Sequence, residues 1–392
     1  MFANSLIPLL FILVSNGFAY SFFVITMPSV GRQMDFSDTA TGAVVGLSAL
    51  ALTLVAPIWG NLCEKWGRRR VILIGIVATT AFNVASATLI QLRLELLLGT
   101  QLAFVLLLST RLLNSLFTGG LKPAGQAFIA DVTSADSRAK GMGLMGAAFG
   151  VGSILGGFSA SLSGSQHLLA GYVAISILLL ASCFVTAVYL PEPRKQPDDS
   201  AAITHAPLPY KRISGFLLIT FLGLMLFSLL QHVIPLTLED RFLLSNDMAI
   251  RRSGMTMMLT MIVMILTQSL LVGRLPLVPR NLIVVGSVVC GCAMIAATFS
   301  HTPATLMLSM CVFGFGLGLL FPGNLASLSL SVDNDSQGRV AGVNGIGQGL
   351  GLASGPIAGS FLHNYTYHAP YIVCVIIMVS IFMMAFVLRR KA

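Results

Sequence analysis

Two positively charged side chains, Arg111 and Lys122, lie inside a long apolar stretch of the chain, residues 99–130. They are eleven positions apart, so a continuous helix with roughly 100° per residue places them only about 20° apart. The same side carries further polar side chains: Ser115, Thr118 and, more loosely, Asn114 and Gln126. An arginine grips a carboxylate or phosphate with two parallel hydrogen bonds. The stripe therefore predicts a site for an anionic or zwitterionic substrate.

Each of the two cations has a second interpretation that involves no substrate. Arg111 also suits a structural role, with its guanidinium bonded to backbone carbonyls of the first apolar segment. If the apolar segments cross a membrane, Lys122 is long enough to extend its ammonium to the inner membrane surface while its stem stays among apolar groups. The fourteen acidic residues all lie in loops or at segment ends, which argues against a site built for an organic cation.

Other polar side chains interrupt the apolar segments: Asn16, Tyr20, Gln231, His232, Gln268, Asn324, Asn344 and Gln348. His232 lies clearly within its segment, and histidine is the side chain whose charge changes most readily between pH 5 and 8. We therefore predict that His232 carries protons. The alternative is a histidine that is satisfied by hydrogen bonds between helices.

The residues predict neither an enzyme nor a cofactor or metal centre, because the sequence has no nucleophile–base pair, metal-ligand cluster or nucleotide-binding loop. The six cysteines lie within or at the ends of apolar segments and form no CxxC pair, so we interpret them as reduced, packed thiols. The net charge of +9 arises from basic residues scattered over short loops. Without a basic face, no nucleic-acid partner is expected.

The composition predicts a membrane protein. Of 392 residues, 56% are hydrophobic and 9% are charged, whereas a soluble domain is about a quarter charged. The long apolar segments do not alternate in polarity, so they predict transmembrane helices and an all-α fold. The twelve segments are roughly 6–30, 39–62, 71–91, 99–130, 138–161, 168–190, 213–236, 254–273, 281–300, 303–330, 339–362 and 369–388.

The placement of Lys and Arg predicts the orientation. With the N-terminus in the cytoplasm, sixteen of these residues fall in inner segments and five in outer segments. Basic residues favour the cytoplasmic side, so both termini are predicted to be cytoplasmic. The first segment, 6–30, is too long for a signal-peptide core and lacks a basic leader, so we expect it to be a retained span.

A stretch rich in proline and charge between the sixth and seventh segments predicts a linker, and the residues on its two sides resemble each other. The matching pairs are Pro123 with Pro322, Arg138 with Arg339, and Gly152 with Gly355. Parallel repeats of this kind place a substrate site between the halves near the bilayer midplane. The predicted parts are a six-helix bundle at 1–190, a cytoplasmic linker at 191–212 and a six-helix bundle at 213–392.

The charged stretch GNLCEKWGRRR resembles the first signature of the major facilitator superfamily. Its matching residues are Gly60, Leu62, Glu64, Lys65, Gly67, Arg68 and Arg69. Glu64 stands where the family usually has Asp. Arg111 takes the arginine position of the second signature. The antiporter signature is matched in full by Gly351, Gly355, Pro356 and Gly359, and in part by Gly152, Gly156 and Gly157, with Ser153 in place of its proline. The surrounding sequence is similar to tetracycline-type and other drug/proton antiporters.

The resemblance implies a twelve-helix fold of two pseudo-symmetric bundles whose first, fourth, seventh and tenth helices line a cavity. Together with the stripe, the implied substrate-binding residues are Arg111, Lys122, Asn114, Ser115, Thr118, Asn16, Tyr20, Gln231, His232 and Asn324. The glycines of the antiporter signature allow close approach of helices. These close contacts either let the helices slide or rock between two arrangements or are static packing.

The resemblance also implies a conformational latch at the charged hairpin, formed by Gly60, Glu64, Gly67, Arg68 and Asp131. We expect Glu64 to meet a helix N-terminus or a basic side chain, and Arg68 to pair with Asp131. The alternative is that the basic residues only anchor the hairpin against anionic lipid.

Together these features predict a monomeric secondary transporter in a bacterial inner membrane, working by alternating access. Its expected partners are a small-molecule substrate, protons and membrane lipids. The expected activity is proton-coupled export of a small organic anion or zwitterion, such as a carboxylate-rich, siderophore-like molecule. The alternatives are uptake of a similar anion, broad drug/proton antiport, and a membrane sensor that no longer transports.

Overall fold

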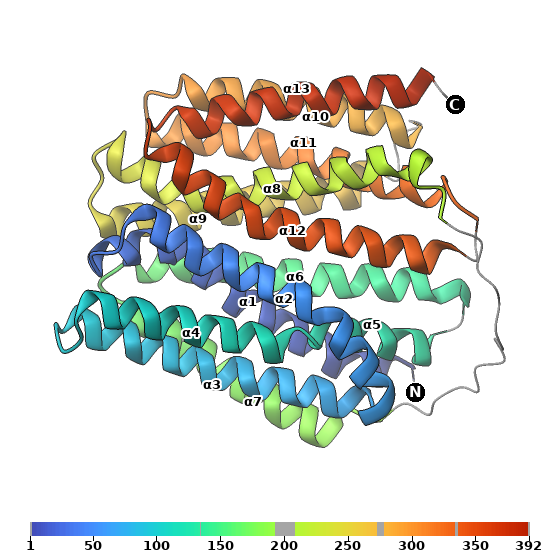
Figure 1. Ribbon diagram of the computed structural model, residues 1–392, viewed down its shortest axis with the longest axis horizontal. Coiled ribbons are helices and arrows are strands. Elements are labelled where there is room, and N and C mark those ends of the chain that lie inside the picture. Colours follow the sequence, from blue (N-terminus) through green and yellow to red (C-terminus); the bar gives the residue numbers. More distant parts are fainter. Residues whose placement is uncertain (1, 134, 193–207, 273–277, 334–335, 391–392) are drawn as a thin grey trace. The chain divides into compact units, whose positions relative to one another are not determined.

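The computed structural model describes residues 2–133, 135–192, 208–272, 278–333 and 336–390 (Figure 1). Within these ranges the chain is helical and contains no β-strand, so the predicted all-α class is confirmed. The chain divides into two compact units, Met1–Ala201 and Ala202–Ala392, and each is described by itself. Most of the predicted linker, residues 193–207, lies outside the described residues.

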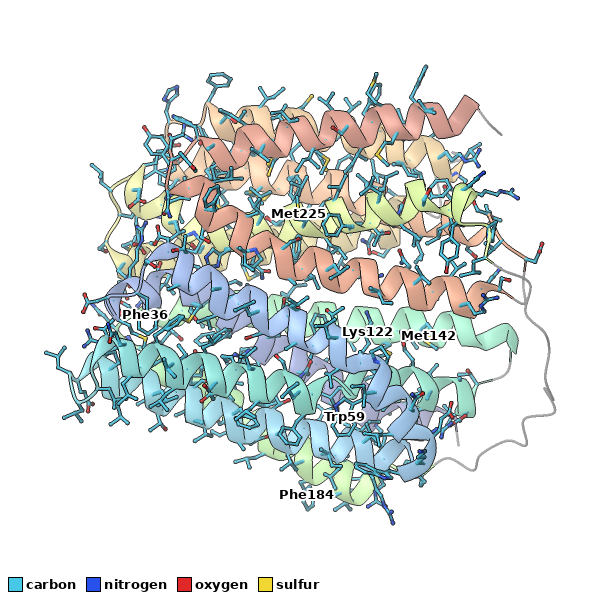
Figure 2. The ribbon with its side chains drawn as sticks, viewed as in Figure 1. Phe36, Trp59, Lys122, Met142, Phe184 and Met225 are labelled. Atoms are coloured by element: carbon cyan, nitrogen blue, oxygen red, sulfur yellow. The ribbon has the colours of Figure 1, made fainter. Side chains whose placement is uncertain are left out.

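The described residues of the N-terminal unit form seven helices: α1 (Phe2–Gln33), α2 (Asp38–Trp66), α3 (Arg68–Leu94), α4 (Thr100–Thr118), α5 (Leu121–Val132), α6 (Ala135–Ser163) and α7 (Leu168–Tyr189). The C-terminal unit contains α8 (Tyr210–Asp240), α9 (Asn246–Leu266), the π-helix η1 (Thr267–Val272), α10 (Pro279–Thr298), α11 (Pro303–Ser329), α12 (Gln337–His363) and α13 (Ala369–Arg390). Their outer faces carry many exposed apolar side chains, such as Phe184 on α7 (Figure 2).

Eleven spans of the described chain are long and apolar enough to cross a membrane. They match the predicted segments, with one exception. The eleventh segment forms α12, which has 27 residues and is long enough to span a membrane. Its many glycines, together with Asn344 and Gln348, lower its hydropathy, so it is not among the eleven.

The predicted span at 99–130 is confirmed as Thr100–Val132, but its helix is interrupted at Gly119 and Gly120, between α4 and α5 (Figure 1). Pro123 explains the break, since proline has no N–H and its ring clashes with the carbonyl four residues earlier. Trp59 of α2, labelled in Figure 2, donates its indole N–H to the Leu116 carbonyl at 2.6 Å. A side chain on Gly120 would lie 2.6 Å from Val71 and 3.0 Å from the Trp59 ring. Glycine at position 120 therefore allows α2 and α3 to pack closely at the break, and Trp59 binds a carbonyl beside it.

The eighth predicted segment, 254–273, also departs from a simple helix. Its α-helical part ends at Leu266, and the last described turn is the π-helix η1. Thr267 of η1 packs closely on α11, where a Cβ at Gly318 would lie 2.6 Å from the Thr267 Cβ. π-Helical turns of this kind mark places where a helix accommodates a close neighbour or a functional bend.

Each unit contains a pair of helices that packs through the glycines of the antiporter signature. In the N-terminal unit a Cβ at Gly152 of α6 would overlap the Val14 carbonyl of α1, and one at Gly156 would lie 2.7 Å from the Ser21 Cβ. Gly157 beside them is buried. Only glycine permits backbones to approach this closely.

The matching pair in the C-terminal unit is α8 and α12. A Cβ at Gly351 would lie 2.5 Å from the Phe221 carbonyl oxygen, and one at Gly355 would overlap Ser228. At Gly359 the nearest atom would be a Val233 methyl, 2.9 Å away. Pro356 is buried in the same helix. The two glycine signatures therefore place equivalent helix pairs in contact, one pair in each unit.

Candidate functional site

Arg111 of α4 lies against aromatic side chains of the N-terminal unit. Its Cζ atom is 3.8 Å from the centre of the Phe23 ring on α1. Tyr20 of α1 and Tyr172 of α7 are close enough to interact with it electrostatically. Its Nε is buried and has no hydrogen-bond partner among the described residues. The guanidinium therefore rests on a ring face, which attracts cations, and retains a donor that is free to bind an anionic group.

The other polar residues of α4 fall into two groups. Asn114 is 8% exposed, and its Oδ1 has no hydrogen-bond partner within the part of the chain that is described. Ser115 and Thr118 are buried, and the Thr118 hydroxyl donates to the Asn114 carbonyl at 2.8 Å. Thr118 is therefore engaged within its own helix, whereas the side-chain oxygen of Asn114 lies one turn from Arg111 without a donor.

Lys122 belongs to α5, beyond the break, and its side chain is exposed (Figure 2). The predicted angle of about 20° between Lys122 and Arg111 assumed one uninterrupted helix. Gly119 and Gly120 interrupt that helix between the two cations, although both keep α-helical dihedral angles. Arg111 is thus half-buried on an aromatic surface, while Lys122 is an exposed cation on a different helix.

The two predicted residues of α1 lie in the same unit as Arg111. Tyr20 is half-buried, and its ring centre is 6.0 Å from that of Phe149 on α6. Asn16, one turn earlier on α1, is also half-buried. Tyr20 is therefore brought together with Arg111, and Phe23 and Tyr172 are the partners that the sequence did not reveal.

The predicted residues of the C-terminal unit are more deeply enclosed. Gln231 and His232 of α8 are both buried. The Asn324 amide of α11 donates to the Phe216 carbonyl at 3.0 Å and to the Thr220 hydroxyl at 2.8 Å. Thr220 in turn donates to the Asn344 side chain at 2.7 Å. Asn324 therefore links α8 to α11 and, through Thr220, to α12.

At the charged hairpin the predicted pair is present. Arg68 Nε lies 2.7 Å from Asp131 Oδ2, with the two side chains 12% and 15% exposed. A second nitrogen of the same guanidinium donates to the Cys63 carbonyl at 3.4 Å. Arg68 therefore ties the end of α2 and the start of α3 to the end of α5.

The carboxylate at the start of α3 belongs to Glu192 and not to Glu64, which was expected to meet a helix N-terminus or a basic side chain. The two carboxylate oxygens of Glu192 accept the backbone N–H groups of Arg68 at 2.6 Å and Arg69 at 3.0 Å. The Arg69 side chain also donates to the Ala187 carbonyl at the end of α7. Glu64 is exposed. The carboxylate reaches the hairpin from the end of α7, where the sequence reads Pro191–Glu192.

Gly67 makes this contact possible. Its φ of 89° lies in the region that favours glycine. A Cβ at Gly67 would also lie 2.6 Å from a carboxylate oxygen of Glu192. Gly60 has a different environment, because a Cβ there would meet no atom within 4 Å. Of the two signature glycines, Gly67 is therefore required by geometry.

A cavity of about 570 Å³ lies elsewhere, between α10 and α13 of the C-terminal unit. Its walls include Ile295, Ile372 and Ile376, and at one end lie Arg241, His301 and His368. Arg241 donates to the carbonyls of Ala297, Thr298 and Ser300, so it closes the end of α10. Partial burial and the nearby Arg241 lower the pKa of His368. None of the predicted binding residues lines this cavity.

Comparison with known families decides the identity of this fold. A family model described as the Major Facilitator Superfamily matches residues 9–297 and 277–392. The chain belongs to the major facilitator superfamily. The predicted family and its drug/proton antiporter-like branch are thereby confirmed, and with them the expectation of a transporter.

Relatives of this superfamily member include bacterial resistance proteins. The chain is 27% identical to multidrug resistance protein 1 of Bacillus subtilis over 353 residues, covering 88% of this chain and 86% of the relative. It is 26% identical to the class C tetracycline resistance protein of Escherichia coli over 380 residues, covering 90% and 88%. It is 27% identical to the multi-drug resistance efflux pump PmrA of Streptococcus pneumoniae over 348 residues, covering 84% and 81%.

Solved structures of superfamily members share the fold. A bacterial homologue of the human lysosomal transporter Spinster, in an inward-facing and unoccupied conformation, gives a TM-score of 0.75 at 14% identity, covering 99% of this chain and 97% of that chain. The D-xylose–proton symporter gives 0.71 at 16% identity, covering 96% and 97%. At these identities the similarity shows the fold alone. The family match and the eleven apolar spans together identify the protein as an integral membrane transporter of the major facilitator type.

Proposed function

We propose that this transporter exports small organic molecules that carry an anionic group, in exchange for protons and by alternating access. The observation that supports the substrate class is Arg111. Its guanidinium is half-buried against Phe23 and has no acidic partner among the described residues. An enclosed cation of this kind binds a carboxylate or phosphate strongly, because charge-assisted hydrogen bonds are roughly twice as strong as neutral ones.

The aromatic side chains around Arg111 favour a substrate with an apolar or ring-shaped body. Phe23 offers a ring face to the cation, and Tyr20 and Tyr172 are near enough to interact with it electrostatically. Pockets that combine apolar walls with a few placed polar groups bind drug-sized molecules. A substrate with both a flat apolar part and a negative group, including an amphoteric drug or a siderophore-like chelator, fits this surface.

The direction of transport is proposed from the relatives. The similar proteins of Bacillus subtilis, Escherichia coli and Streptococcus pneumoniae are named for drug resistance and efflux. They also support the second candidate, a drug/proton antiporter of broad specificity. Uptake of an organic anion and a non-transporting sensor remain alternatives without such support.

We further propose that the protein lies in a bacterial inner membrane with both termini in the cytoplasm, as the distribution of Lys and Arg predicts. The hairpin between α2 and α3 then faces the cytoplasm. There the pairing of Arg68 with Asp131 and the contact from Glu192 form the part of the latch that belongs to the N-terminal unit. The two glycine seams supply close contacts along which helices rock.

A screen of two probe classes tests the substrate assignment. The purified protein is heated in detergent with benzoate, citrate or tetracycline, and with ethidium or tetraphenylphosphonium. Ligands that bind the folded state raise its melting temperature. We expect the anionic or amphoteric probes to stabilise it, and inside-out vesicles with an imposed proton gradient to accumulate the best of them. Stabilisation by the cations alone would contradict the assignment and favour the broad drug antiporter.

A further inference from the structure

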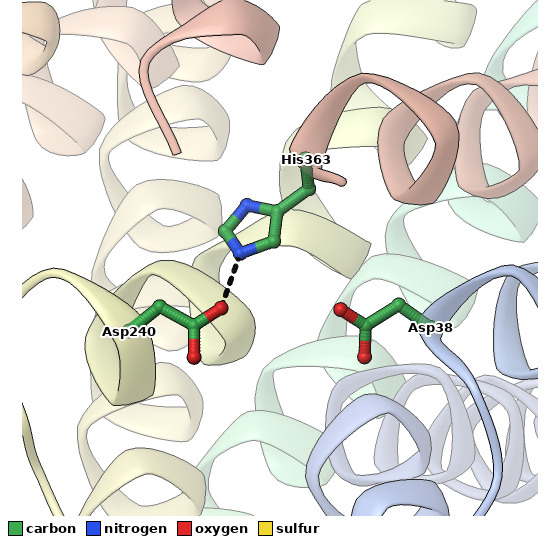
Figure 3. A group of neighbouring side chains, drawn as sticks. All are labelled: Asp38, Asp240 and His363. Atoms are coloured by element: carbon green, nitrogen blue, oxygen red, sulfur yellow. Dashed lines mark hydrogen bonds and ion pairs between the residues drawn. The ribbon is translucent and has the colours of Figure 1, made fainter. Parts of the chain in front are cut away.

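The C-terminal ends of α8 and α12 meet at a histidine–carboxylate pair. His363 Nε2 lies 2.8 Å from Asp240 Oδ2 (Figure 3). The His363 side chain is 3% exposed, whereas that of Asp240 is 41% exposed. Asp38, also drawn in Figure 3, belongs to the N-terminal unit, where its carboxylate pairs with Arg32 at 2.7 Å. The pair thus joins a buried imidazole to a carboxylate that reaches solvent.

His363 continues the glycine seam of α12. Gly351, Gly355, Gly359 and His363 follow one another at intervals of four residues, and this spacing keeps them near one face of a helix. The three glycines lie against α8, and His363 meets the last residue of α8. At the offset of 203 that relates Gly152 to Gly355, the first half has the buried Ala160. The second half therefore has a titratable side chain where its repeat has a small one.

The His363 imidazole lies close to negative charge. Asp240 and His363 are the final residues of their helices, and the C-terminal end of a helix carries partial negative charge. His363 Nδ1 is buried and has no hydrogen-bond partner among the described residues. A proton that binds there turns the contact with the Asp240 carboxylate from a hydrogen bond of a neutral imidazole into an ion pair.

Other charged and titratable groups at this end of the C-terminal unit have their own partners. Glu239 of α8 accepts from the Asn246 amide at 3.3 Å, and Asp247 of α9 pairs with Arg251 at 2.8 Å. Arg241 is bonded to the end of α10. From α13, Tyr371 donates to Thr237 at 3.0 Å. Beside α13, the His368 ring lies tilted against the Tyr367 ring, with ring centres 4.4 Å apart. The His363–Asp240 pair is the site among these where a buried base directly contacts a carboxylate.

We propose that His363 and Asp240 form a proton-binding pair through which the pH on the outer side of the membrane acts on transport. The proposal rests on the proposed export function and on the predicted topology, which places the C-terminal ends of α8 and α12 at the outer face. One proton from the outer solution enters past the exposed Asp240 carboxylate and binds His363 Nδ1. The charged pair then ties α8 to α12. Release of the proton to the same solution restores the weaker hydrogen bond between the neutral imidazole and the carboxylate, and loosens the two helix ends.

The first test needs no substrate. Thermal unfolding of the purified protein in detergent is followed from pH 8 to pH 6 for the wild type, His363→Gln and Asp240→Asn. As pH falls, the wild type should gain about 2 °C or more in melting temperature relative to both variants, because the pair then becomes charged. His301→Gln, which changes an exposed histidine of the same unit, is the matched control and should follow the wild type. Parallel pH curves for the wild type and both pair variants would overturn the proposal.

The second test uses proteoliposomes loaded with tetracycline as the probe. His363→Gln should lose most of the dependence of tetracycline transport on outer pH and should retain counterflow at equal pH on both sides. If tetracycline transport by His363→Gln and by Asp240→Asn depends on outer pH as it does in the wild type, the pair is not where outer pH acts on transport. If the wild type moves no tetracycline or other probe, the export function fails instead, and the unfolding curves still decide whether the pair binds a proton. If His363→Gln does not fold, Asp240→Asn reports on the same pair from its exposed side.

Discussion

Glu192 caps the start of α3, and its replacement by alanine gives the sharpest test of the hairpin geometry. The carboxylate accepts N–H groups of Arg68 at 2.6 Å and Arg69 at 3.0 Å, two of the four donors that a helix start leaves without partners. Loss of a capping side chain costs roughly 0.5–2 kcal/mol, and loss of its attraction to the helix dipole costs about 0.3–1 kcal/mol. Because Glu192 is exposed, we expect a total near the low end, about 1 kcal/mol.

Cys63 is a natural reporter for this change. It is 2% exposed, and its carbonyl accepts the Gly67 N–H at 3.1 Å. A loss of about 1 kcal/mol in local stability raises the open fraction of the hairpin about fivefold. We therefore expect Glu192→Ala to speed maleimide labelling of Cys63 about fivefold, measured on its peptide by mass spectrometry.

Glu64→Ala is the matched control, because it removes a carboxylate of the same hairpin that is exposed and does not cap α3. Its labelling rate at Cys63 should equal that of the wild type. Equal rates in the wild type and Glu192→Ala, or acceleration by Glu64→Ala alone, would refute the assignment of Glu192 as the cap.

Three further predictions concern other contacts. A double-mutant cycle with Arg68→Ala and Asp131→Ala, followed by thermal unfolding, should give a coupling free energy of about 1 kcal/mol, since both side chains are mostly buried; additive losses would contradict the pair. Gly355→Ala should lower the melting temperature by several degrees, because its Cβ would overlap Ser228, whereas Gly338→Ala should not. Partial burial and Arg241 lower the pKa of His368 in the folded protein, so the unfolded chain binds a proton more readily there. The folded state should therefore lose stability as pH falls through the ordinary histidine range, and His368→Gln should remove that loss of stability from the unfolding curve.

Hydropathy and composition were sufficient to predict the helices. Lipid leaves the backbone few options, so runs of about twenty apolar residues become helices whatever their neighbours are. The same argument could not reveal the break between α4 and α5. Two glycines followed by Pro123 are visible in the sequence at this point. The hydrogen bond that Trp59 donates to the Leu116 carbonyl beside the break forms only when α2 packs against α4.

Contacts between residues that the family resemblance names could be predicted from the sequence. Contacts between such a residue and one that the resemblance does not name could not. Arg68 and Asp131 are 63 positions apart, yet the signature pattern named both. Glu192 is 124 positions from Arg68, and nothing in the hairpin sequence specifies which acid will cap it. Phe23 could not be matched to Arg111 for the same reason, because an aromatic residue in an apolar helix has many possible neighbours. His363 was missed because it lies at the very end of its span, where polar residues are ordinary.

The account depends most on Arg111 as the residue that binds the anionic group of the substrate. The most direct measurement is the dissociation constant of the best-stabilising organic anion for the wild type, Arg111→Ala and Arg111→Lys, with Arg252→Ala as a control that removes an exposed arginine of α9. A hydrogen bond to a charged group contributes about 1.5–3 kcal/mol, so Arg111→Ala should weaken binding at least tenfold, Arg111→Lys should weaken it less, and the control should leave it unchanged. Wild-type affinity in a folded Arg111→Ala protein would contradict the account.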